Sequence, residues 1–99
     1  MISAVVLINV QRNQINETAQ SLLEIEGVAE VYSVTGEYDL VAIVRVRRYD
    51  QMAAVVPQHI ASVAGVKRTH TLMAFQHFSR HDLDRMWGIG LEAEPTPDA

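Results

Sequence analysis

The chain of 99 residues contains no cysteine. This absence excludes disulfide scaffolds, thiol nucleophiles and zinc sites built on cysteine. Proline and glycine are also scarce, with 3 and 5 residues, which leaves no room for a low-complexity segment. A hydrophobic share of 48% and a charged share of 20% are instead typical of a single globular domain.

Long hydrophobic runs and an excess of basic charge are missing as well. The apolar stretch over residues 1–10 is interrupted by Ser3 and Asn9 and has no basic region before it. These features exclude a signal peptide and a membrane span, so we expect a cytoplasmic protein with no membrane partner. The balance of 8 Lys+Arg against 12 Asp+Glu gives a net charge of −4. It argues against direct nucleic-acid binding, because phosphate contacts require a basic surface.

Hydrophobic periodicity predicts the order strand, helix, strand, strand, helix, strand. Alternation with a period of two predicts four strands, over residues 2–10, 28–35, 40–47 and 66–78. Gly27 and Gly65 end the two intervening helices, and each is followed at once by a valine and a strand. Two such similar units predict an α+β, ferredoxin-like βαββαβ sandwich, with a four-stranded antiparallel sheet and both helices on one face.

The helices have recognisable starts and one weak point. Asn13 is expected to cap the first helix, and Asp50 the second. Pro57 lies inside the second helix and predicts a kink or an early break, because proline removes a backbone hydrogen bond. The predicted buried stripes are Ile15, Ala19, Leu22 and Leu23 in the first helix, and Met52, Val56, Ile60 and Val63 in the second.

Large apolar residues occur on both faces of the predicted strands. Val5 and Leu7 alternate with Val6 and Ile8 in the first strand, and the third strand has the same pattern. Since the helices cover one face only, a monomer would expose an apolar patch on the order of several hundred Å². We therefore predict dimerisation through the sheet, as in a dimeric α+β barrel. The alternative is that the C-terminal segment with Trp87 folds back over this face.

The domain is predicted to comprise residues 1–84. Residues 85–99 are expected to form a short C-terminal helix or turn and a flexible polar tail. Leu83, Met86 and Trp87 suggest the helix, which two nearby glycines weaken.

No metal site, cofactor motif or catalytic set is predicted. His70 and His77 are an odd number of residues apart, so they face opposite sides of one strand, and His81 lies beyond the strand end. No glycine-rich phosphate loop and no nucleophile elbow occurs.

Basic residues are predicted to gather at one edge of the sheet, where the third strand ends and the fourth begins. Because the chain is acidic, we interpret this cluster as a solvated or subunit-bridging patch, facing Glu24, Glu26 and Glu30. The cluster consists of Arg45, Arg47, Arg48, Lys67 and Arg68.

The turn Thr35–Asp39 carries the strongest local signal. It can be a plain hairpin turn, with Gly36 supplying a positive φ and Asp39 bonding its own backbone. The same turn can bind a ligand, because exposed turn amides hold a carboxylate and Asp39 can hold an ammonium group.

Three stretches resemble the ligand-binding and oligomerisation (RAM) domain of the leucine-responsive regulatory protein (Lrp/AsnC) family. They are Gly27–Val31, Val34–Leu40 and Gly65–Thr71, and the resemblance extends over residues 4–84. In this family the domain follows a DNA-binding helix-turn-helix domain. Because the first strand begins at Ile2, the chain looks like a stand-alone RAM protein.

The resemblance implies a non-enzymatic, amino-acid-sensing module in a homo-oligomer, a ring of dimers that is often an octamer. Full-length Lrp/AsnC regulators are the partners it suggests, without direct nucleic-acid contact. The implied ligand-binding residues are Gly36, Glu37, Tyr38, Asp39, Thr69 and Thr71. Two alternatives stay open: a small dimeric α+β-barrel enzyme using His70 or Tyr32, and a structural adaptor with a vestigial pocket.

Strand geometry adds one expectation about this site. Asp39 and Thr69 are predicted at opposite ends of the sheet, too far apart for one amino acid to bridge. If both hold the same ligand, they come from different subunits.

Overall fold

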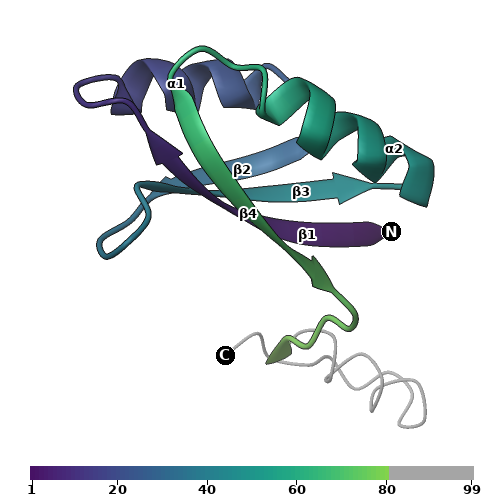
Figure 1. Ribbon diagram of the computed structural model, residues 1–99. Helices are drawn as coiled ribbons and strands as arrows, with labels where there is room; N and C mark the ends of the chain where they lie inside the picture. Colours follow the sequence, from purple (N-terminus) through teal and green to yellow (C-terminus); the bar gives the residue numbers. More distant parts are fainter. Residues whose placement is uncertain (81–99) are drawn as a thin grey trace, which may run out of the picture.

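A computed structural model of the chain describes residues 1–80 as one βαββαβ unit (Figure 1). The predictions for residues 81–99, including the third helix, the tail and His81, lie outside the described residues. The elements are β1 (Ile2–Val10), α1 (Ile15–Leu23), β2 (Val28–Ser33), β3 (Leu40–Val46), α2 (Tyr49–Ala54), the π-helix η1 (Val55–Ile60) and β4 (Val66–Ala74).

The four strands form one antiparallel sheet in the order β2-β3-β1-β4, and both helices lie on one side of it (Figure 1). The predicted ferredoxin-like α+β fold is thereby confirmed. β1 and β3 are the central strands, whereas β2 and β4 are the edges.

The core lies between the sheet and the helices. It contains the alternate residues of the two central strands: Ala4, Val6, Ile8 and Val10 of β1, and Leu40, Ala42, Val44 and Val46 of β3. Leu22 of α1, Met52 of α2, and Val55 and Ile60 of η1 pack against them. Period-two alternation, with β-branched residues on the pleated surface, explains why these segments form strands.

The opposite face of the sheet, which we call the open face, has no helix over it in the described part of the chain. Val5 and Leu7 of β1 and Val41 and Ile43 of β3 are half-buried there. Leu72 of β4 and Tyr32 of β2 stand 47% and 49% exposed on the two edge strands. The predicted two-sided apolar character of the strands is confirmed.

The prediction for α1 is wrong in two respects. Asn13 is not the cap: it has a φ of 68°, and Gln14 flanks the helix without a side-chain capping bond. Thr18 and Leu22 form the buried stripe, whereas Leu23 is 51% exposed. Thr18 is buried where Gly65 closely approaches α1: a Cβ at position 65 would clash with the Thr18 hydroxyl.

The break predicted at Pro57 is confirmed. The α-helix ends at Ala54 and continues as the π-helix η1, in which the Ala61 N–H donates to the Val56 carbonyl oxygen at 3.2 Å. The wider π turn shifts the buried stripe, so Val55 is buried and Val56 only half-buried. The helix begins at Tyr49 after the N-cap Arg48, so the prediction that Asp50 caps it is wrong, and Asp50 lies in its first turn.

β4 is shorter than predicted and ends at Ala74. Beyond it Phe75 and Phe78 are 94% and 72% exposed, and the chain leaves the sheet on the side away from the helices (Figure 1). Within residues 1–80, no helix is long and apolar enough to cross a membrane.

Candidate functional site

The β2–β3 hairpin is fastened to the end of β1. The Val34 N–H donates to the Asp39 carbonyl oxygen at 3.0 Å and closes the turn, in which Gly36 has a φ of 109°. The Asp39 N–H donates to the carbonyl oxygen of Ile8 at 2.9 Å. These bonds hold Asp39 against the central strand rather than at the tip of the turn.

The Asp39 carboxylate is partly engaged by its own chain. Its Oδ2 accepts a hydrogen bond from the Val10 N–H at 2.9 Å. Val10 lies two residues beyond Ile8, the last residue of β1 that pairs with β3. Oδ1 has no hydrogen-bond partner within residues 1–80. One carboxylate oxygen is therefore positioned by the backbone, while the other can accept a hydrogen bond from a ligand.

Hydrogen bonds through Asn9 link the hairpin to β1 and, beyond it, to β4. The Asn9 Nδ2 donates to the Glu37 carbonyl oxygen at 2.7 Å, and the Arg68 Nη2 donates to the Asn9 Oδ1 at 3.1 Å. The ring of Tyr38 stacks on His70 with centroids 6.5 Å apart and an interplanar angle of 29°. The hairpin is thus fixed to β4 as well as to β1.

The start of β4 contains a β-bulge. Asn9 pairs with Arg68 but Val10 pairs with Val66, so Lys67 is an extra residue without a partner in β1. A shallow depression of about 460 Å³ forms there, lined by Asn9, Val10, Asp39, Lys67 and Arg68. A second depression adjoins it: Val10, Asp39 and Lys67 line both, and Arg12 is among the other residues that line the second.

The comparison with protein families decides what kind of domain carries this site. The family model "Lrp/AsnC ligand binding domain" matches residues 3–83. The chain belongs to the Lrp/AsnC family. Its match corresponds to that family's ligand-binding domain.

Known relatives agree with this assignment. The HTH-type transcriptional regulator FL11 of Pyrococcus abyssi is 33% identical over 73 residues, which cover 74% of this chain and 48% of FL11. The chain spans about half the length of the curated relatives it matches.

Two solved structures are informative. TTHA0845 from Thermus thermophilus is 48% identical, with a TM-score of 0.75, over 81% of this chain and all of that one. The feast or famine regulatory protein of M. tuberculosis, complexed with L-methionine, is 31% identical, with a TM-score of 0.68, over 80% of this chain and 53% of that one.

In this Lrp/AsnC domain, Asp39 and Thr69 lie at the same end of the sheet. Ile8 pairs with both Leu40 and Thr69, so the prediction of opposite ends is wrong. Both β3 and β4 run antiparallel to β1, and each begins beside the end of β1. The distance argument for two subunits therefore fails.

The structure does not bring the two threonines together with the hairpin residues. Thr69 and Thr71 pair with Ile8 and Val6, so their side chains lie on the helix-covered side. Arg68 and His70 point to the open face, where they meet the hairpin.

Sequence reasoning missed Asn9 as a site residue and assigned Lys67 and Arg68 to another feature. The sequence contains a signal for the bulge. Val66 and Thr69 both lie on the helix side of β4, although they are three residues apart, and in a regular strand residues an odd number apart lie on opposite sides.

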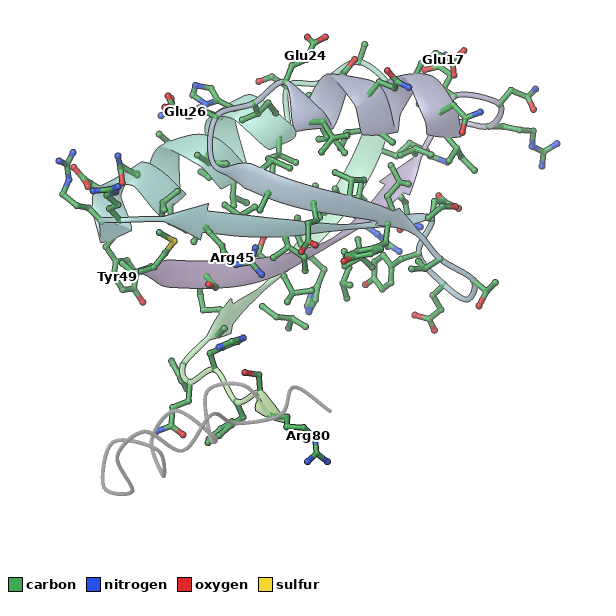
Figure 2. All side chains as sticks on the ribbon, turned by 180° about the vertical axis from the view of Figure 1, so that it is seen from behind. Glu17, Glu24, Glu26, Arg45, Tyr49 and Arg80 are labelled. Atoms are coloured by element: carbon green, nitrogen blue, oxygen red, sulfur yellow. The ribbon has the colours of Figure 1, made fainter. Side chains whose placement is uncertain are left out.

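The predicted basic cluster is wrong, because it is divided between the two ends of the sheet. Arg45 pairs with Ser3 at one end, and Arg68 pairs with Asn9 at the other. Arg45 lies 3.7 Å from Glu30 on the open face, whereas Glu17 of α1 and Glu24, just beyond its end, lie on the opposite side (Figure 2). Of the three acidic partners expected for the cluster, only Glu30 forms an ion pair with it. Within residues 1–80, no three metal-ligating side chains cluster.

Proposed function

We propose that this chain is an oligomeric, amino-acid-binding effector module that modulates transcription through Lrp/AsnC regulators. The observation that carries the proposal is the family match over residues 3–83. Its support is a 31% identical relative of the same fold that was solved with L-methionine.

The hairpin supplies the groups that an amino acid requires. In this proposal the Asp39 Oδ1 accepts a hydrogen bond from the ammonium group of the amino acid, and the backbone amides around Gly36, Glu37 and Tyr38 donate hydrogen bonds to its α-carboxylate. Thr69 and Thr71 lie on the helix side of the edge strand β4, half-buried. They would contact the effector where the hairpin of a second subunit reaches that side.

The open face supports the oligomeric part of the proposal. Apolar side chains lie on this face in all four strands: Tyr32 pairs with Val41 and Val41 with Leu7, while Val5 pairs with Leu72. A second copy packed sheet to sheet would remove these side chains from water, at roughly 25 cal/mol per Å² of apolar area. The ring of dimers and the contact with full-length regulators extend the same proposal.

Calorimetry with a panel of amino acids tests the proposal. The variant Asp39→Asn keeps an oxygen to accept the Val10 N–H but removes the charge. We expect it to weaken amino-acid binding about 10–100-fold, because hydrogen bonds to charged groups contribute about 1.5–3 kcal/mol each. Asp50→Asn is the control. It makes the same substitution at an exposed carboxylate of α2, which forms an ion pair with Arg48 and does not line the depression.

The possible results separate the three functions. Equal affinities in the wild type and Asp39→Asn would reject Asp39 as the ammonium partner. Failure of every amino acid to bind the wild type would favour the structural adaptor. Conversion of an added amino acid would favour the enzyme.

A further inference from the structure

Two consecutive basic residues of β4 line the same depression as Asp39. In a regular strand, Lys67 and Arg68 would point to opposite faces of the sheet. The bulge removes Lys67 from the pairing with β1, and both side chains line the depression. A bulge that re-aims a side chain is a recurrent feature next to functional sites.

The charges in this depression are not neutralised by one another. Neither Lys67 nor Arg68 forms an ion pair with Asp39, and Lys67 has no hydrogen-bond partner within residues 1–80. In the described part of the chain, Arg68 forms one side-chain hydrogen bond, from its Nη2 to the Asn9 Oδ1, and its other N–H groups have no partner there. Two cations and one carboxylate oxygen thus face the same space.

The remaining lining explains what the depression does not favour. Val10 is the one apolar residue that residues 1–80 contribute to its lining, so a hydrophobic effector side chain would find little to pack against. Glu37 contributes its backbone carbonyl to Asn9, and its side chain is not part of the lining. Arg12, in the adjoining depression, adds a third positive charge at this end of the sheet.

We propose that this site selects amino acids that carry a second carboxylate, the class of aspartate and glutamate. The inference rests on the proposed function, because it assigns the effector class of the same site. Asp39 binds the ammonium group, Arg68 joins the turn amides at the α-carboxylate, and Lys67 binds the second carboxylate. A neutral amino acid would leave Lys67 without a partner.

The test compares each acidic amino acid with its uncharged isostere by calorimetry on the full 99-residue chain. We expect L-glutamate to bind about tenfold more tightly than L-glutamine, and L-aspartate more tightly than L-asparagine, since one charged contact differs. Because shape is matched within each pair, the ratio of affinities isolates the second carboxylate.

Substitutions at Lys67 locate the preference. Lys67→Gln should reduce the glutamate-to-glutamine ratio to near one, whereas Lys67→Arg should keep most of it. Lys67→Glu should reverse the preference towards lysine or arginine, because the depression then holds two carboxylates and one cation. Arg47→Gln is the matched control: it removes one positive charge just beyond Val46, which pairs with Ile2, roughly 25 Å along the sheet.

The outcomes distinguish this inference from the function on which it rests. A glutamate preference that is lost in Lys67→Gln and kept in Arg47→Gln supports it. Equal binding of acidic and neutral amino acids, or a preference unchanged in Lys67→Gln, overturns it and leaves the proposed function standing. Failure of all amino acids to bind overturns both. Circular dichroism spectra establish that each variant is folded before its binding is compared.

Discussion

The two faces of the sheet carry similar apolar side chains but differ in what covers them. On the helix side Val6, Ile8 and Leu40 are fully buried within one chain. On the open face their neighbours Leu7 and Val41 are only half-buried, and Leu72 is 47% exposed. The same alternating strands thus complete one core within the chain and leave the other to be completed by contact with another surface.

This difference has a consequence for where stability and function reside. The covered face stabilises the monomer fold through burial of its apolar core. The hairpin end of the open face holds Asn9, Arg68 and the Tyr38–His70 stack in one polar arrangement. Association of sheets would therefore bring a second copy close to the candidate site.

The largest expected effect is on the covered face. Ile8→Ala should lower the free energy of unfolding by about 2–5 kcal/mol, because it leaves a cavity in a fully buried position of the central strand. Urea denaturation measures the loss, and Ile8→Val is the graded control, with an expected loss of about 0.5–1.5 kcal/mol. A loss below about 1 kcal/mol for Ile8→Ala would show that the covered face contributes less than its burial indicates.

The neighbouring residue tests the open face. Wild-type protein should sediment without detectable monomer at micromolar concentration, as a dimer or a larger assembly. Leu7→Asp should shift it to monomer, because the charge would have to lie within a desolvated sheet-to-sheet contact. Gln20→Asp adds the same charge on exposed α1 and should leave the assembly unchanged. A folded wild-type monomer would contradict the proposed dimer.

The sequence was a good guide wherever local pattern determines the structure. Strand alternation predicted the fold. The glycines at positions 27 and 65 have the expected positive φ values of 106° and 99°. The prediction that they end the helices is wrong, because the C-caps are Glu24 and Ala61, and each glycine lies in the turn that leads into the next strand. The buried stripe of α1 was mispredicted, because the contact between Thr18 and Gly65 is tertiary and leaves no trace in periodicity.

The candidate site was predictable only in its hairpin part. The turn residues and Asp39 follow from sequence, since turn chemistry is local. Lys67 and Arg68 join Asp39 through strand register and a bulge, which depend on pairing between distant segments. Thr69 and Thr71 fall on the other side of β4 for the same reason.

The smallest effect concerns the charges on the open face. The Tyr32 hydroxyl donates to the Glu30 Oε2 at 3.0 Å, and Glu30 also lies 3.7 Å from Arg45. The hydrogen bond to Glu30, and then its negative charge, raise the pKa of Tyr32 above the usual 10.0. Folding therefore favours neutral Tyr32, so the contribution of this bond is complete below the unfolded pKa. It is lost as pH rises through the folded pKa.

Glu30→Gln removes the charge and should move the pKa of Tyr32 back towards its usual value. The ultraviolet absorbance of tyrosinate during alkaline titration measures it, and subtracting the Tyr32→Phe titration removes the signal of the other tyrosines. A pKa of Tyr32 that is equal in the wild type and in Glu30→Gln would reject Glu30 as the cause of the shift.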